Sequence, residues 1–292
     1  MLLESPSFGV LTLATSRDYL KAIGLSLSLR ITNPGVPIAV ACSAGISQRL
    51  LPYFDHVIQE KEGLRGFVHK VHLDQYTPFK ETLFFDSDVL VFRQVRPYVD
   101  SWGPFPYRAC GHYMVDGRSS FGMDRRAVLK RIGKERMVVI DGAGHAFFRK
   151  PECVDVFEQA REVTRRHAEY VGHIPYADED VMDIVMTIRD LPPAPYTDFF
   201  ARYLSAKPGT MSMDATVGHC SYISALTGRE CNPCMVHFAA NEAPLPYGIQ
   251  LRRLMSRFGA PKDGLLEMIA GDCVRHYVKE PLIRRMKGAL KP

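Results

Sequence analysis

Two carboxylates lie two residues apart in this chain, directly after a short apolar run. Asp86 and Asp88 follow residues 82–85, whose β-branched and aromatic side chains are typical of a buried strand. Such carboxylates repel each other unless water or a cation lies between them, and their oxygens are ligands that Mg²⁺ and Mn²⁺ prefer. A metal ion held in this way commonly binds a diphosphate as well. The pair is therefore a candidate metal site, with a solvated Asp-rich turn as the simpler alternative.

His237 is a third candidate ligand, although a histidine among apolar residues is more often a hydrogen-bonded core residue. An imidazole added to two carboxylates would shift the metal preference from Mg²⁺ towards Mn²⁺. A rival group of thiols and imidazoles could hold a structural zinc ion. Its members would be Cys220, Cys231, Cys234 and either His219 or His237. Because only one Cys-x-x-Cys pair exists, packed thiols are the preferred interpretation, and a zinc-stapled, non-enzymatic binding domain is an alternative.

Three consecutive acids, Asp178, Glu179 and Asp180, open a predicted helix that continues to Ile188. The helix dipole favours acids in the first turn of a helix, and this effect alone would account for the three residues. Their carboxylates are also able to act as general acids, general bases or nucleophiles in catalysis.

The elements that must position these residues alternate between strands and helices. Residues 9–15 and 37–42 have the apolar composition of buried strands, and residues 20–29 between them have helical spacing. This order is a right-handed βαβ unit, so we expect an α/β fold with a mostly parallel central sheet. Ligands of such sheets bind beyond the carboxyl ends of strands, which is where Asp86 and Asp88 lie.

The composition excludes several classes of protein. Of the 292 residues, 46% are hydrophobic and 24% charged, a balance that excludes a disordered chain. No apolar run approaches the roughly 20 residues that span a bilayer, and the start of the chain does not resemble a signal peptide. We therefore expect a cytoplasmic protein whose seven cysteines are reduced.

The net charge of +5 is concentrated at the end of the chain. Residues 274–292 hold six cations and one acid, so the rest of the chain is formally neutral and is not a nucleic-acid-binding surface. Four apolar residues of this tail share approximate helical spacing: Leu282, Ile283, Met286 and Leu290. A stretch of this kind is typical of peripheral attachment to an anionic membrane surface. It is equally typical of a solvated C-terminal helix.

Taken in order, these segments resemble the GT-A nucleotide-sugar glycosyltransferases, and in pattern the retaining enzymes of the glycogenin and lipooligosaccharide galactosyltransferase kind. The resemblance covers about residues 8–245. It is carried by the opening strand and its loop to Tyr19, by Lys70 sixteen residues before Asp86, and by the Asp-x-Asp segment. The acidic segment 178–180 and the segment around His237 complete it.

The resemblance implies a single GT-A, Rossmann-like domain over residues 1–245, followed by a basic helical extension over residues 246–292. It implies metal-dependent transfer of a sugar from a nucleoside-diphosphate sugar to a saccharide or lipid-linked acceptor, with retention. Donor-nucleotide binding would fall to Thr15, Asp18, Tyr19, Lys70, Asp86 and Ser87. Asp86, Asp88 and His237 would hold Mn²⁺ or Mg²⁺, and Asp178, Glu179 and Asp180 would be the catalytic residues.

The chain departs from that family where close relatives carry Asp-Gln-Asp, because Glu179 stands in place of the amide. A carboxylate there could act as nucleophile or as base, which leaves the stereochemistry open. Close relatives also have a Lys after the metal-binding His, where this chain has Glu242 and Ala243. A second enzymatic alternative is a phosphatase similar to the haloacid dehalogenases, whose Asp-x-Asp motif normally follows the first strand.

Overall fold

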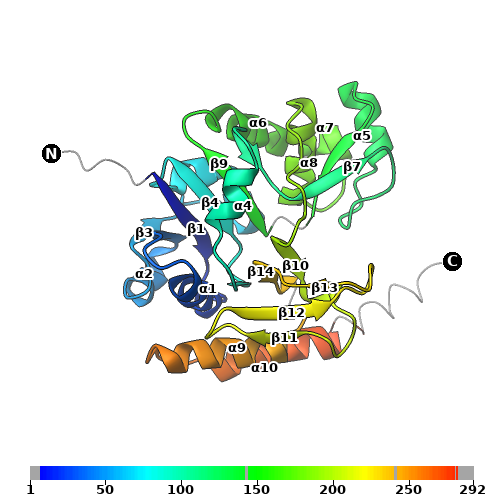
Figure 1. Ribbon diagram of the computed structural model, residues 1–292. Helices are drawn as coiled ribbons and strands as arrows, with labels where there is room; N and C mark the ends of the chain where they lie inside the picture. The colour runs from blue at the N-terminus through cyan, green and yellow to red at the C-terminus, as the bar shows by residue number, and fades with distance from the viewer. Residues whose placement is uncertain (1–6, 142–143, 240–241, 280, 282–292) are drawn as a thin grey trace. The chain divides into compact units, whose positions relative to one another are not determined.

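The computed structural model describes residues 7–141, 144–239, 242–279 and 281 (Figure 1). The α-helices are α1 (Tyr19–Thr32), α2 (Ala44–Leu50), α3 (Leu73–Tyr76), α4 (Arg96–Ser101), α5 (Arg125–Ile132), α6 (Val154–Arg165), α7 (His167–Val171), α8 (Asp178–Ile188), α9 (Pro244–Arg257) and α10 (Leu265–Val274). Shorter helical turns are η1 (Gly66–His72), η2 (Tyr203–Ser205) and η4 (Arg275–Lys279). The strands are β1 (Phe8–Ala14), β2 (Ile38–Cys42), β3 (His56–Gln59), β4 (Glu81–Phe85), β5 (Val89–Val91), β6 (Tyr107–Arg108), β7 (Gly111–Met114), β8 (Met137–Ile140), β9 (His145–Arg149), β10 (Phe200–Arg202), β11 (Ser212–Asp214), β12 (His219–Ile223), β13 (Glu230–Cys231) and β14 (Met235–His237).

The chain divides into two compact units, each built from three stretches of sequence. Unit 1 comprises the described residues of Met1–Leu13, Val36–Asp86 and Arg96–Thr197. Unit 2 comprises the described residues of Ala14–Gly35, Ser87–Val95 and Asp198–Pro292.

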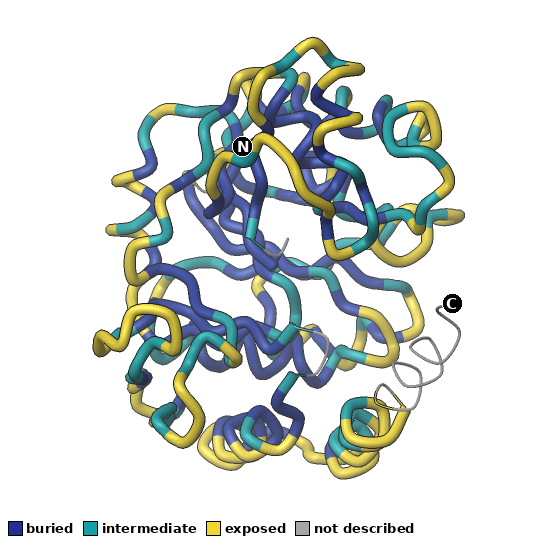
Figure 2. Tube along the Cα trace, turned by 90° about the vertical axis from the view of Figure 1, so that its right-hand side faces the viewer, coloured by how far each residue is buried: buried dark blue, intermediate teal, exposed yellow. Residues whose placement is uncertain are grey.

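Unit 1 is built on a six-stranded sheet in the order β3-β2-β1-β4-β9-β6. β1 pairs with β4, and β2 with β3, in parallel, whereas β9 runs antiparallel to β4 and β6. The interior strands are buried along almost their whole length, as expected for a sheet covered on both faces (Figure 2). At Gly9 a Cβ would lie 2.4 Å from the ring of Phe79, so only glycine allows this ring to pack on β1.

Helix α8 covers the second, two-stranded sheet of unit 1, formed by β7 and β8. Two side chains of α8, one turn apart, accept the backbone N–H groups on the free edge of β8. Thr187 Oγ1 accepts the bond from Val138 N at 2.9 Å, and Asp183 Oδ1 accepts that from Ile140 N at 2.8 Å. The helix thus replaces a neighbouring strand and satisfies polar groups that would otherwise be buried without partners.

Unit 2 is organised around α1, which is buried over most of its length and contacts β5 and α9. Val91 N donates to Ser28 Oγ at 3.1 Å, and Val95 N donates to Asn33 Oδ1 at 2.8 Å. These bonds attach the strand that follows Asp88 to the helix. A Cβ on Gly24 would lie 2.4 Å from Leu251 Cδ1, so the close approach of α1 and α9 requires glycine there.

The C-terminal helices belong to unit 2. α9 begins at Pro244, and its buried residues include Leu251 and Leu254. The apolar residues of the tail, Leu282, Ile283, Met286 and Leu290, lie outside the described residues. Within the described part of the chain, no helix is long and apolar enough to span a membrane.

Candidate functional site

The turn after β4 carries the Asp-x-Asp segment. β4 lies between β1 and β9, so its carboxyl end is at the middle of the sheet. Asp86 N donates to Gly144 O at 2.9 Å, which fixes the backbone at the end of the strand. The sequence expectation that this carboxylate follows a buried strand agrees with the structure.

In unit 1, Lys70 lies between two carboxylates. Its Nζ is 2.8 Å from Asp86 Oδ1 and 3.0 Å from Asp178 Oδ2. Burial by itself would lower the pKa of Lys70, but the charges of Asp178 and Asp86 outweigh it and raise that pKa above its ordinary value. Lys70 is therefore a permanent cation, and η1 and the first turn of α8 place it and Asp178 together.

In unit 2, strand pairing brings His237 to Asp88. β5 and β14 are antiparallel, with His237 opposite Val89, so His237 lies next to the residue that precedes β5. His237 Nε2 is 3.1 Å from Asp88 Oδ1, and Phe238 N donates to Asp88 O at 3.1 Å. The imidazole is buried, and the backbone bond fixes Asp88 from the opposite strand.

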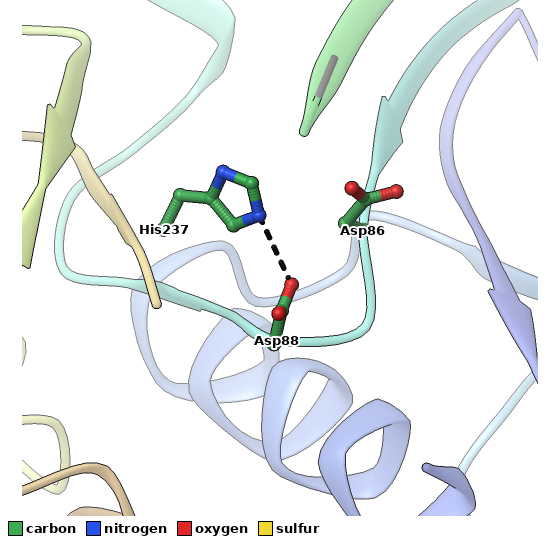
Figure 3. Close-up of side chains that lie close together, drawn as sticks. All are labelled: Asp86, Asp88 and His237. Carbon is green, nitrogen blue, oxygen red and sulfur yellow. Dashed lines mark ion pairs between the residues drawn. The ribbon is translucent and has the colours of Figure 1, made fainter. Parts of the chain in front are cut away.

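One ligand atom from each of Asp86, Asp88 and His237 lies within 4.8 Å of the other two (Figure 3). The two acids come from one turn, and His237 reaches them through its contact with Asp88. Two carboxylates and one imidazole form a donor set that fits Mn²⁺ and also accepts Mg²⁺. In the part of the chain that is described, this is the metal-ligand cluster that the fold assembles.

The cysteine group does not form a second cluster among the described residues. Cys234 is buried, and its thiol donates weakly to the carbonyl oxygens of Arg93 and Gln94. Burial raises the pKa of the Cys220 thiol to about 12. Cys231 is half-buried, and its thiol lies 3.7 Å from Arg229 O. Cys220 and Cys234 are thus buried, packed thiols in this structure.

The predicted nucleotide-binding loop is a tight turn at the start of α1. Thr15 N and Thr15 Oγ1 both donate to Asp18 Oδ1, at 2.5 and 2.9 Å. Burial raises the pKa of Asp18, against the effect of the bonds from Thr15, and the charge of Asp88 raises it further. Tyr19 is half-buried as the first residue of α1, and Ser87 is half-buried in the turn between the two acids. Asp18 therefore shapes the loop, and it is close enough to feel the charge of Asp88.

The three acids at the start of α8 face different surroundings. Consecutive helical residues are about 100° apart, so the first and third of a triplet point to nearly opposite sides. Asp178 binds Lys70, whereas Asp180 Oδ2 accepts a bond from Ser119 Oγ at 3.1 Å. Burial raises the pKa of Asp180. Glu179, between them, is half-buried.

Sequence reasoning missed a group in unit 2 that surrounds Asp18 and Asp88. Tyr247 on α9 is buried, and burial together with the charges of Asp88, Asp272 and Asp18 raises the pKa of its hydroxyl. Lys21 forms an ion pair with Asp272 at 2.8 Å and lies 5.8 Å from the centre of the Tyr247 ring. No local pattern links these positions, because their proximity depends on the packing of α9 and α10 beside α1.

No protein-family description matches the sequence, and no curated protein sequence matches it. Solved structures do match. The galactosyltransferase LgtC, solved in complex with donor and acceptor sugar analogs, is 13% identical with a TM-score of 0.54, and the match covers 85% of this chain and 95% of LgtC. An active-site mutant of LgtC is also 13% identical with a TM-score of 0.53, covering 88% of this chain and 98% of that one.

The bifunctional glycosyltransferase WbbM in its apo form is 12% identical with a TM-score of 0.51. That match covers 82% of this chain and 46% of WbbM, so the chain spans less than half of that protein. At these identities the likeness shows the fold. The expected mixed α/β architecture, with a mostly parallel central sheet of the GT-A glycosyltransferase type, is confirmed.

Proposed function

We propose that this chain is a metal-dependent glycosyltransferase that moves a sugar from a nucleoside-diphosphate sugar to a saccharide or lipid-linked acceptor. The observation that carries the proposal is the cluster of Asp86, Asp88 and His237 in a chain with the fold of LgtC. LgtC was solved with donor and acceptor sugar analogs, which supports a sugar donor and a sugar-bearing acceptor here.

In the proposed reaction, Asp86, Asp88 and His237 hold Mn²⁺ or Mg²⁺. The ion, when bound, neutralises charge that develops on the departing nucleoside diphosphate. Lys70 supplies a second, permanent cation beside Asp86. Because its charge is fixed before the donor arrives, it lowers the free energy of a charged transition state without reorganisation.

The remaining predicted residues divide into contact and support roles in this proposal. Thr15, Asp18, Tyr19 and Ser87 would contact the nucleotide. Asp178 holds Lys70 in place through the ion pair at 3.0 Å. Of the three acids, we assign Glu179, half-buried between Asp178 and Asp180, to the reacting sugar. Retention is the expected outcome if Glu179 acts as nucleophile.

The test is to incubate the purified protein with a panel of nucleoside-diphosphate sugars and to measure the products with and without Mn²⁺. We expect slow, Mn²⁺-dependent release of nucleoside diphosphate, which Asp88→Asn abolishes. Asp155→Asn, at an acid whose side chain is 75% exposed, is the matched control and should change nothing. Release of inorganic phosphate from a range of phosphomonoesters, with inhibition by beryllium fluoride, would contradict the proposal.

The phosphatase alternative fits the structure less well. That family normally has the Asp-x-Asp motif after the first strand, whereas here the motif follows β4. In that alternative Asp86 would form an aspartyl phosphate. Its carboxylate is instead bound by Lys70, which in turn is bound by Asp178.

A further inference from the structure

A basic pocket in unit 2 is separate from the residues assigned above. It is open to the surface, has a volume of about 540 Å³, and is lined by Thr216, Ile249, Arg252, Arg253, Ser256 and Arg257. Five of these residues come from the exposed face of α9, and Thr216 follows β11. We call it the α9 pocket.

The charges of the α9 pocket are strongly unbalanced. Three of its lining residues are arginines, and none is an acid. Arg253 Nη1 lies 3.8 Å from Oδ2 of Asp214, an acid outside the lining. Asp214 Oδ1 already accepts bonds from Thr216 N at 3.0 Å and Thr216 Oγ1 at 2.6 Å. Among the described residues, Arg252 forms no ion pair.

The walls of the α9 pocket are held in place by a buried side chain. Gln250, 5% exposed, accepts a bond from Ala215 N at 2.9 Å and donates to Met213 O at 2.9 Å. Arg257 also donates to Thr216 O. The loop after β11 is therefore fixed to α9 at several points, so that ligand binding does not have to order this wall of the pocket.

The edge of the α9 pocket is apolar. Ile249, in its lining, is 54% exposed, and Leu245 one turn earlier on α9 is 52% exposed. Val217, next to Thr216, is 66% exposed. A ligand that fits this surface has an anionic group for the arginines and an apolar part for these side chains.

We propose that the α9 pocket binds a phosphoryl group, with the phosphate of an anionic lipid as its expected source. Guanidinium groups bind phosphate oxygens through paired N–H donors, and Ser256 adds a hydroxyl donor. The apolar edge favours a phosphate carried by a lipid over a free one. This proposal is independent of the chemistry at Asp86 and Asp88.

The test uses the full chain, so that the basic tail contributes equally in every protein. Binding to vesicles of neutral phosphatidylcholine, with and without phosphatidic acid, is measured by flotation. Binding of inorganic phosphate is followed by NMR. The pocket variant is Arg252→Ala/Arg253→Ala, which spares the loop-anchoring Arg257. The matched control is Arg126→Ala/Arg165→Ala, which removes two exposed arginines elsewhere.

We expect the wild-type protein to float with phosphatidic acid vesicles and not with neutral ones. The pocket variant should bind them roughly 30-fold more weakly, from about 1 kcal/mol for each arginine near an anionic surface. The control variant should change by less than about threefold. Phosphate-induced NMR shifts that the pocket variant loses, without selective flotation, would support the phosphoryl site and assign it to a soluble ligand. Equal losses in both variants, or no loss in either, would overturn the proposal.

Discussion

Lys70 Nζ lies 3.0 Å from Asp178 Oδ2, and both side chains are almost fully enclosed, at 12% and 7% exposed. The same ammonium group binds Asp86, so one cation connects the strand end that carries the Asp-x-Asp segment with the start of α8. Burying an unpaired charge at such a position costs free energy, so the stability of each charged group depends on the presence of the others.

Replacing Lys70 with Met should lower the free energy of unfolding by about 3 kcal/mol in metal-free protein, because two carboxylates lose their cation. The double variant Lys70→Met/Asp178→Leu should recover part of that loss, since it removes one of the stranded charges. Urea unfolding measures both. Lys134→Met, whose partner Asp190 is 79% exposed, is the control and should cost less than about 1 kcal/mol. Equal losses of unfolding free energy in Lys70→Met and Lys134→Met would refute the interpretation that Lys70 is a buried cation on which Asp86 and Asp178 depend.

Replacing Asp88 with Asn should weaken Mn²⁺ binding at least about tenfold and weaken donor binding with it, because a charged ligand is lost while the side-chain shape is kept. Isothermal titration with Mn²⁺ measures this in the absence of any substrate. Asp155→Asn should bind Mn²⁺ as the wild type does. Unchanged Mn²⁺ affinity together with slower turnover would instead indicate that Asp88 is a general acid–base catalyst, as in the phosphatase alternative.

Glu179→Gln and Asp180→Asn should have different effects although the residues are neighbours. Asp180 is buried against Ser119, so its replacement should act mainly on stability. Glu179→Gln should lower kcat by roughly 100-fold or more with little change in donor affinity, as expected for a nucleophile or base. Turnover, donor affinity and urea unfolding of both variants check the contrast. A Glu179→Gln protein with wild-type kcat would show that Glu179 takes no part in the catalytic step.

The stability of the protein should depend on pH through Asp183. Burial raises its pKa well above the usual 3.8, with further increases from Glu179 and Asp180, while the bond from Ile140 N and the charge of Arg125 oppose the shift. Above pH 3.8 the unfolded chain has lost a proton that the native state retains, so stability falls by about 1.4 kcal/mol per pH unit up to the native pKa.

Asp183→Asn removes this titration and keeps an oxygen that accepts the bond from Ile140 N. Its stability relative to the wild type should therefore rise with pH above 3.8, the pKa of the unfolded chain, until the native pKa is reached. Urea unfolding across this range provides the measurement, with Asp155→Asn as the exposed control. A difference between variant and wild type that stays constant with pH would show that Asp183 is ionised in the native state.

The local elements around the site were predictable from the sequence. The apolar run before Asp86 is β4, the βαβ unit at the start of the chain is β1, α1 and β2, and α8 begins at Asp178. These follow from hydrophobic periodicity and from residues that begin or end an element, which are properties of neighbouring residues.

Only the tertiary structure decided which distant residues meet. His237 reaches Asp88 because β14 pairs with β5 in one particular register, and Lys70 reaches Asp178 through the packing of η1 with α8. Strand register and helix packing depend on shape and burial across elements far apart in the sequence, which leave no pattern in any one segment. The sequence therefore determined the kinds of side chain available, and the fold determined which of them form one site.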